Sequence, residues 1–409
     1  MSPKRRVVIT GFGALTPIGN DADGIVASLR GGRSGIRAMP QWAEWKDLHT
    51  RVGGVVDGFD EKSIPREFRR SMSRMACLAA EATRRALESS RLPAETLSSG
   101  RAGISLGQTV AAPSPTQVYF DTLRAEGVRA LKSTTFFQMM GHSAAANTAL
   151  MFGCKGRVWA PNAACASSSQ AIGQGFETIA AGQQDVMLCG GSEELHATTA
   201  ITFDIVQGTS RAFNASPTQT PRPFDRARDG LVVAEGAGVV VLEALDHAVK
   251  RGAPVLGEVL GFATTCDGEH MSQPSKAGMA KTMALALEGA GLAARDIGYV
   301  NAHATATPTG DGVEAQATLD VLGAGVPVSS TKGHTGHTLA ACGAIEVIFS
   351  LLMMQRGFLA PTLNLSDVAD DCRGPNLLRE PLEQRVTRVL SNNFAFGGVN
   401  TSLVLSAPA

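Results

Sequence analysis

One arrangement occurs twice in this 409-residue chain, about 170 residues apart. An extended apolar run leads into a polar loop that holds reactive side chains, and a helix of small residues follows. The first copy is VWAPNAACASSSQAIGQGFETIAAGQQD and the second is PVSSTKGHTGHTLAACGAIEVIFSLLMMQRG. Because each copy has the same plan, we predict two similar halves, at residues 1–252 and 253–409.

Short apolar strands and helices alternate along the rest of the chain. Residues 70–91 carry apolar and small residues at helical spacing with charges on the other face, and a second helix is expected near 276–291. Strands are expected at 7–10 (followed by a glycine turn), 103–106, 157–160, 186–189, 255–259 and 299–301, with two more about a glycine turn in 231–242. This alternation predicts an α/β fold with a mainly parallel sheet.

Charge and hydropathy exclude several classes of partner. The chain has 37 Lys+Arg and 37 Asp+Glu, so it lacks the overall positive field of a nucleic-acid-binding protein. It contains no run of about 18 uninterrupted apolar residues, so we expect no membrane span. The apolar run near the start is broken by Gly11 and Gly13 and has no cleavage site, which indicates a first strand and not a signal peptide.

The seven cysteines are scattered and include no CxxC pair. This pattern argues against a disulfide framework or a zinc site and favours the reducing cytoplasm. Cys165 differs from the others because it lies in NAACASSS, between an extended run and a helix of small residues. A helix N-terminus stabilises a thiolate and points backbone N–H groups at a developing oxyanion. The alternative for Cys165 is a buried apolar cysteine.

Two histidines follow short apolar runs. His303 lies in YVNAHATATPTGD and His337 in SSTKGHTGH, and loops of this kind at strand ends reach clefts. A structural role is the alternative for each histidine taken alone. His334 and His337 have a spacing that suits a metal ion, but no carboxylate or cysteine completes the set, so we predict no metal site.

Together, the cysteine and the two histidines suit one kind of chemistry. A thiolate accepts an acyl group, and two neutral imidazoles donate hydrogen bonds to a second thioester carbonyl while negative charge builds on it. The three segments therefore predict thioester transfer followed by carbanion formation.

The chain resembles the elongating β-ketoacyl-acyl-carrier-protein synthases (types I and II) over nearly its whole length. The motifs that carry the resemblance are VVITGFGALTPIGN, AACASSSQAIG, DVMLCGGSEE, RPFDRARDGLVVAEGAGVVVLE, NAHATATPTGD, SSTKGHTGH and SNNFAFGGVNTSLVL. The resemblance implies an α/β thiolase fold with five layers (αβαβα) made of two similar halves. It also implies decarboxylative condensation of an acyl group with malonyl-acyl-carrier protein, without a cofactor or a metal.

The resemblance also implies catalytic roles for four residues of the chain and a supporting role for a fifth, Glu346. Cys165 matches the nucleophile that accepts the acyl group. His303 and His337 match the paired histidines of decarboxylation and condensation. Lys332 matches the active-site lysine, and Glu346 matches the glutamate that pairs with it.

Three further positions match supporting residues of the family. Asp311 and Glu314 resemble the acidic residues that hold the loop after the first histidine. Phe396 matches the gating phenylalanine, whose backbone N–H joins that of Cys165 in the oxyanion hole. For Phe396 the alternative is core packing, and Phe394 is expected to serve only that purpose.

An acidic acyl-carrier protein is the implied partner, in its acyl and malonyl forms. Two basic segments resemble the carrier-docking patches of the family, although Glu67 departs from the pattern, and a local cationic surface steers an acidic partner. A solvated helix face is the alternative. The basic residues are Arg66, Arg69, Arg70 and Arg74 in the first segment and Arg129 and Lys132 in the second.

The resemblance implies a homodimer, with a heterodimer containing a chain-length-factor-like subunit as an alternative. Phe136, Phe137, Met139 and Met140 are expected to line the acyl tunnel across a dimer interface or to pack in a plain interface or core. The segments TTFFQMMGHSAAANTALMFG and MPQWAEWKDLHTRV look closer to ketosynthases of aryl-polyene-type pathways.

The motifs argue against two other functions. A degradative thiolase needs a second catalytic cysteine near the C-terminus, and FAFGGVN has none. An inactive chain-length-factor subunit lacks the nucleophile, whereas Cys165, His303 and His337 are all present. Both alternatives are therefore disfavoured.

Overall fold

The computed structural model describes residues 5–110 and 112–408. A sheet of eleven strands runs through it in the order β11-β10-β9-β12-β13-β8-β1-β7-β6-β4-β5. The strands on the β1 side are β1 (Val7–Leu15), β4 (Ala102–Gly107), β5 (Val158–Trp159), β6 (Val186–Glu193) and β7 (Gly236–Ala244). Those on the β8 side are β8 (Gly257–Cys266), β9 (Tyr299–Asn301), β10 (Pro327–Ser329), β11 (Asn376–Leu377), β12 (Arg388–Ala395) and β13 (Val399–Ser406).

The two sides of the sheet repeat one pattern outward from the antiparallel β1–β8 pair. From β1, the neighbours β7 and β6 pair antiparallel, and β4 and β5 then pair parallel. From β8, the neighbours β13 and β12 pair antiparallel, and β9 and β10 then pair parallel. The prediction of two similar halves thus has a counterpart in the topology, while the division at residues 252 and 253 stays a prediction.

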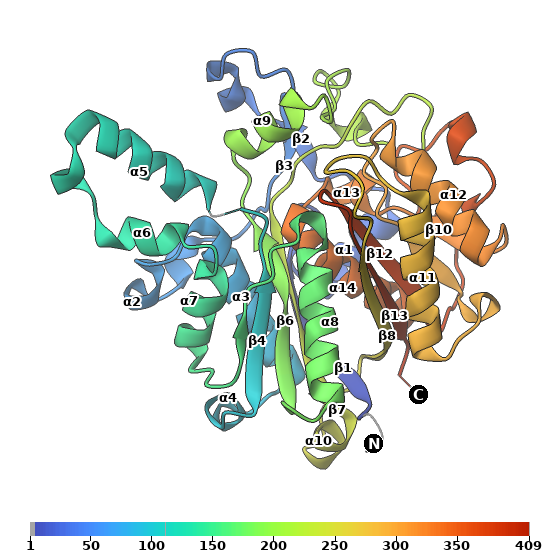
Figure 1. Cartoon of the computed structure of the whole chain (residues 1–409), viewed down its shortest axis with the longest axis horizontal. Coiled ribbons are helices and arrows are strands. Elements are labelled where there is room, and N and C mark those ends of the chain that lie inside the picture. The colour runs from blue at the N-terminus through green and yellow to red at the C-terminus, as the bar shows by residue number, and fades with distance from the viewer. Residues whose placement is uncertain (1–4, 111, 409) are drawn as a thin grey trace.

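Helices form three layers: one outside the β1 half of the sheet, one outside the β8 half, and one between the two halves (Figure 1). α3 packs on β1 and β7, and α11 packs on β8 and β13. α8 and α14 lie between the two halves of the sheet. α8 contacts both β6 and β13, and α14 contacts both β7 and β12. The five-layered α/β thiolase fold is therefore confirmed.

A small second sheet joins β2 (Ile36–Ala38) to β3 (Val52–Gly54). The helices are α1 (Ala22–Arg30), α2 (Arg66–Arg69), α3 (Arg74–Ser90), α4 (Ala94–Ser98), α5 (Pro113–Glu126), α6 (Ser133–Met139), α7 (Ser143–Phe152), α8 (Ser167–Ala180), α9 (Ala197–Ile205), α10 (Leu245–Lys250), α11 (Lys276–Ala290), α12 (Gly310–Leu322), α13 (Lys332–Thr335) and α14 (Cys342–Arg356). The predicted helices at 70–91 and 276–291 are confirmed as α3 and α11.

The sheet is mixed, so the expectation of a mainly parallel sheet is wrong. β12 and β13 form a hairpin about Gly397 and Gly398, whose φ angles are +86° and +69°. A tight hairpin makes its two strands antiparallel. Buried strands are apolar on both faces whichever way they run, so the apolar runs did not reveal their direction.

Two predicted glycine turns are also wrong. β1 continues through Gly11 and Gly13 to Leu15. A Cβ at Gly13 would lie 2.0 Å from the carbonyl oxygen of Ala82, so this glycine lets α3 approach the strand and does not turn the chain. In residues 231–242 a single strand begins at Gly236, and the residues before it make isolated bridges, one of them between Val233 and His337.

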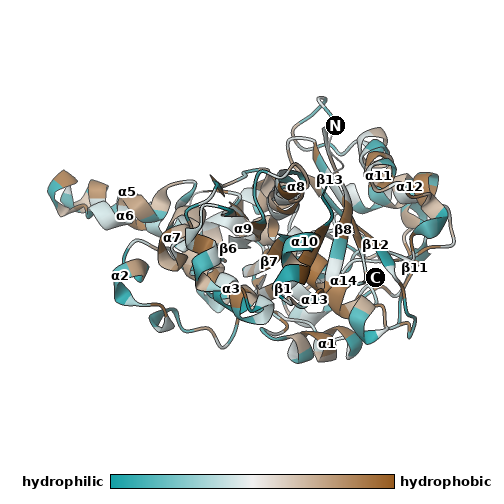
Figure 2. Cartoon of the chain, turned by 90° about the horizontal axis from the view of Figure 1, so that it is seen from below, coloured by the Kyte–Doolittle hydropathy of each residue, from teal (hydrophilic) through white to brown (hydrophobic). Residues whose placement is uncertain are grey.

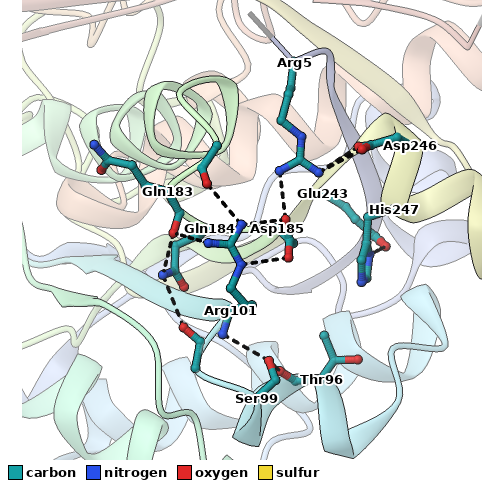
Figure 3. Close-up of polar contacts among 12 residues, drawn as sticks. Arg5, Thr96, Ser99, Arg101, Gln183, Gln184, Asp185, Glu243, Asp246 and His247 are labelled. Atoms are coloured by element: carbon teal, nitrogen blue, oxygen red, sulfur yellow. Dashed lines mark hydrogen bonds and ion pairs between the residues drawn. The ribbon is translucent and has the colours of Figure 1, made fainter. Parts of the chain in front are cut away.

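A charged network ties the starts of β1, β4 and β6 together (Figure 3). Asp185, just before β6, accepts hydrogen bonds from Arg101, just before β4, at 2.9 Å. It also accepts one from Arg5, just before β1, at 2.8 Å. The hydrogen bond from Arg101 is the largest cause of the lowered pKa of Asp185. It outweighs the opposing effect of burial, and the pKa falls to about 2.

Among the described residues, one helix is long and apolar enough to cross a membrane by length and composition. It spans Leu339–Arg356, and 89% of this window is buried inside the fold. α14 therefore belongs to the central layer of the fold, and its apolar side chains are in the same core cluster as Ile9, Leu242 and Val389.

An arm made of α5 and α6 projects from the body and carries apolar residues (Figures 1 and 2). Val118, Phe120, Phe136 and Phe137 are each exposed by 44% or more. Large apolar side chains gathered on a projecting arm are a feature of interaction surfaces.

Candidate active site

Cys165 lies in the turn that connects β5 to the buried helix α8. Ala164 before it has a φ of +47°, and a short 3-10 turn over Ala164–Ala166 leads into the first residue of the helix, Ser167. The side chain of Cys165 is almost fully buried, with 6% exposed. The chain therefore presents this thiol at the N-terminal end of a helix that lies between the two sides of the sheet.

Burial decides the protonation state of this thiol. It raises the pKa of Cys165 from 9.0 to about 12, although Lys332 opposes the rise. The rise corresponds to about 4 kcal/mol, which exceeds the roughly 2 kcal/mol that a helix N-terminus supplies in favourable cases. The resting group is therefore the thiol.

His303 and His337 converge on Cys165 from the second half of the chain. Nε2 of His337 lies 2.9 Å from Sγ of Cys165. The two imidazole rings meet edge to face, with centroids 5.3 Å apart. Burial lowers the pKa of both histidines well below 6.5, and Lys332 lowers it further. Both rings are therefore neutral at physiological pH.

Backbone contacts hold His337 in place. Its N–H donates to the carbonyl oxygen of Val232 at 2.7 Å, and its own carbonyl accepts from the N–H of Ala234 at 2.9 Å. The extended segment before β7, which was expected to be a strand of its own, therefore serves as the support of this histidine.

Asp311 and Glu314, in the first turns of α12, hold the loop of His303. Glu314 accepts hydrogen bonds from the backbone N–H groups of His303 and Ala304, at 2.7 and 2.6 Å. Asp311 accepts from the backbone of Thr305 at 3.1 Å. Burial raises the pKa of Glu314 to about 8 and that of Asp311 to about 6. The oxygens of both carboxyl groups accept hydrogen bonds from backbone N–H groups of this loop, which is the geometry expected of residues that support it.

Lys332 and Glu346 form an ion pair inside the core. The ammonium of Lys332 donates to Oε1 of Glu346, and their side chains are exposed by only 1% and 3%. Burial opposes the charge, but the attraction of Glu346 outweighs it and raises the pKa of Lys332. A fixed positive charge therefore lies close enough to lower the pKa of both active histidines.

A cavity of about 300 Å³ connects this group to solvent. Cys165, His303 and His337 line it, together with Phe396 at the β12–β13 hairpin. The ring of Phe396 is 44% exposed and lies 5.8 Å from that of Phe203 on α9. Phe396 is thus placed in the wall of the cavity and not in the core.

Family models match both parts of the chain. The description "Beta-ketoacyl synthase, N-terminal domain" matches residues 4–248, and "Beta-ketoacyl synthase, C-terminal domain" matches residues 256–366. The chain belongs to the beta-ketoacyl synthase family. Among curated relatives, 3-oxoacyl-[acyl-carrier-protein] synthase 1 of Haemophilus influenzae is 36% identical, with 98% of each chain covered.

Two solved structures extend this result. A beta-ketoacyl synthase from Burkholderia phymatum is 44% identical, with a TM-score of 0.96 over 99% of this chain and 100% of that one. A type II polyketide ketosynthase, solved in complex with its acyl-carrier protein, is 26% identical, with a TM-score of 0.91 over 99% of this chain and 100% of that one. The fold around the cavity is therefore that of the beta-ketoacyl synthases.

The predicted docking residues of this ketoacyl synthase lie away from the cavity, on two neighbouring elements. Arg66, Arg69 and Arg70 are in or next to α2, while Arg129 and Lys132 lie between α5 and α6. The side chain of Gln138 on α6 reaches the backbone after α2, so the C-terminal end of α6 adjoins the first basic segment. Arg74, which the sequence placed in the first basic segment, forms ion pairs with Glu235 and Glu61. It is therefore not available to bind a partner.

Sequence reasoning missed Asn393, which connects several groups of the site. Its Nδ2 donates to Oε2 of Glu346 at 2.7 Å and lies 3.5 Å from Nδ1 of His303. Its Oδ1 accepts from the hydroxyl of Ser169 on α8. The polar run Ser-Asn-Asn inside a fully buried strand was the available signal, because buried polar groups are kept only where they are paired. Phe394, next to Asn393, was expected to pack in the core, and its ring lies edge-on to His303 with centroids 6.3 Å apart.

Proposed function

We propose that this chain is an acyltransferase of the 3-oxoacyl-[acyl-carrier-protein] synthase type. It catalyses the decarboxylative Claisen condensation of an acyl group, held on Cys165, with malonyl-acyl-carrier protein. The observation that carries the proposal is the meeting of Cys165, His303 and His337 at the base of a cavity, with one side-chain ligand atom of each within 4.8 Å of the others. Family membership and the curated relatives support the same reaction.

The first stage transfers the acyl group. The thiol of Cys165 gives its proton to Nε2 of His337, 2.9 Å away, and the thiolate attacks the thioester of the incoming acyl-carrier protein. Backbone N–H groups of Cys165 and Phe396 hold the tetrahedral oxyanion. The proton then leaves with the carrier thiol, so that both imidazoles are neutral again.

The second stage forms the carbon–carbon bond. With the ring proton of His337 moved to Nε2, the neutral rings of His303 and His337 donate hydrogen bonds to the thioester carbonyl of the malonyl group, and carbon dioxide leaves as the enolate forms. The enolate carbon attacks the acyl carbon on Cys165 and releases the sulfur as a thiolate, which takes up a proton from solvent. The product is a β-ketoacyl-carrier protein two carbons longer. Burial, with the positive charge of Lys332, keeps both rings neutral, which this role as donors requires.

The assembly has two further components. The exposed basic residues on α2 and between α5 and α6 suit an acidic carrier protein. A second copy of this chain is the occupant that fits the apolar arm of α5 and α6, because like subunits cover each other's apolar surface in closed dimers. A cytoplasmic setting suits the unpaired cysteines of the described chain.

Intact-protein mass spectrometry after incubation with an acyl-carrier protein tests the function. The wild type should gain the mass of one acyl group, and Cys165→Ala should not; an adduct retained on the variant would overturn the nucleophile. Cys165→Gln should keep malonyl decarboxylation and lose condensation. Saturated and polyenoic acyl carriers compared in the same assay test the aryl-polyene pathway, which a strict preference for saturated chains would rule out.

A further inference from the structure

We infer that Cys165, His303 and His337 also form a binding site for a zinc-class divalent cation, and that the cation and the acyl group exclude each other there. The metal is an inhibitor in this proposal and not a cofactor of condensation. Binding itself follows from the side chains alone, while its effect on acyl transfer rests on the proposed function.

The donor atoms are already gathered. One atom from each residue lies within 4.8 Å of the other two, and Nε2 of His337 is 2.9 Å from Sγ of Cys165. In a tetrahedral site with Zn–S of 2.3 Å and Zn–N of 2.0–2.1 Å, the donors lie about 3.3–3.7 Å apart. Side-chain shifts of about 1 Å at the cavity wall therefore suffice to close the site.

The chemistry of the donors selects the class of metal. A thiolate with two imidazoles is a set that zinc prefers, whereas magnesium and calcium require oxygen ligands. Three protein ligands leave a fourth position, and the cavity supplies solvent or a small ligand to it. His334 takes no part, because both of its ring nitrogens face backbone carbonyls, those of Arg33 and Pro361.

The carboxyl groups near the site leave it close to neutral overall. Burial raises the pKa of Glu193 and of Glu314 to about 8, so both are largely protonated at pH 7, and the carboxylate of Glu346 is paired with Lys332. Oε1 of Glu193 has no hydrogen-bond partner among the described residues. The proposal therefore rests on the geometry and chemistry of the three donors.

Binding balances without a redox step. The metal replaces the proton of the Cys165 thiol, a Zn–S bond forms, and one proton is released to solvent. The neutral imidazoles bind through their lone pairs. A thioester sulfur carries no negative charge, so the acylated enzyme lacks the strongest ligand. Acylation should therefore protect the enzyme, and bound zinc should block the first acyl transfer.

Cobalt(II) serves as the spectroscopic probe, with the full-length, metal-free enzyme. We expect one Co²⁺ per chain, with intense visible bands of four-coordinate cobalt and a thiolate-to-cobalt charge-transfer band. Cys165→Ser should abolish the charge-transfer band. Cys342→Ala, which removes a thiol beside Cys165 that is not a proposed ligand, should leave it unchanged. The absence of the band in the wild type, or its loss in Cys342→Ala only, would overturn the site.

Zinc affinity gives a second measure. Competition with a chelating indicator should show at least a 100-fold weaker dissociation constant for Cys165→Ser and for His303→Gln, with circular dichroism confirming that each variant is folded. Wild-type affinity in both variants would sink the proposal. Acyl-adduct formation measured without metal separates the two ideas, because it tests the proposed function whether or not the metal binds.

Discussion

Glu346→Gln removes the negative charge from the buried pair while keeping nearly the same shape. The side chain of Glu346 accepts from Lys332 and from Nδ2 of Asn393, the latter at 2.7 Å. Glutamine keeps one acceptor oxygen for Lys332, but its NH2 group is a donor and cannot replace the bond from Asn393. The variant therefore leaves the ammonium of Lys332 in the core without a counter-charge and also breaks one hydrogen bond.

The expected loss is large because the pair is almost entirely removed from water. Exposures of 1% and 3% put it among buried ion pairs, for which removal of one partner costs about 3–5 kcal/mol. Unfolding entropy of about 2.1 cal/mol/K per residue over 409 residues converts this loss to a fall in Tm of about 3–6 °C. Asp320→Asn breaks the exposed Lys276–Asp320 pair, with 48% and 51% exposure, and should cost less than about 1 kcal/mol.

Urea unfolding followed by far-ultraviolet circular dichroism, with thermal scans at the same pH, measures both variants. The double variant Lys332→Met/Glu346→Gln should recover at least about 2 kcal/mol, because it removes the uncompensated charge. A Glu346→Gln protein within about 1 kcal/mol of the wild type would refute the reasoning. So would a double variant as unstable as the sum of the two single ones.

Three further outcomes follow from particular contacts. Gly13→Ala places a Cβ 2.0 Å from a carbonyl oxygen of α3 and should lower the urea-unfolding free energy by about 2 kcal/mol, whereas Gly289→Ala, in open space on α11, should raise it by up to about 1 kcal/mol. Asp185, held at a pKa of about 2 by Arg101 against the opposing effect of burial, stabilises the fold above pH 4 and loses this as pH falls towards 2. Asp185→Asn should therefore reduce the fall in urea-unfolding free energy between pH 5 and pH 3 by up to about 1 kcal/mol. Asn393→Ala should lower kcat for condensation about tenfold with KM unchanged, and a change in KM alone in steady-state assays would contradict the positioning role.

The identities of the reactive residues were predictable because each lies in a short motif at the end of a strand. Cys165, His303 and His337 follow β5, β9 and β10, and polar loops at strand ends meet at one edge of an α/β sheet. The roles of Lys332 and Glu346 came from the resemblance alone. Their contact joins residues that are 14 positions apart, in a loop helix and the core helix that follows it.

What the sequence could not supply is information about long-range partners. Gly11 and Gly13 resemble a turn until α3 is placed against them. Arg74 resembles a surface charge until the fold brings Glu235, 161 positions away in the chain, within 2.6 Å. Strand direction and the role of Asn393 depend in the same way on neighbours that local patterns do not describe.

Burial explains how one site can be both unreactive at rest and competent with its substrate. A thiol with a pKa of about 12 is ionised to only about one part in 10⁵ at pH 7, so it reacts slowly with small electrophiles that reach the cavity. In the proposed mechanism, transfer of its proton to His337, which lies 2.9 Å away, generates the thiolate as the oxyanion forms beside it. The low polarity that suppresses the free thiolate also keeps both imidazoles neutral, as the later decarboxylation requires. The apolar burial of the site therefore serves both half-reactions, and a substitution that admits water should weaken both together.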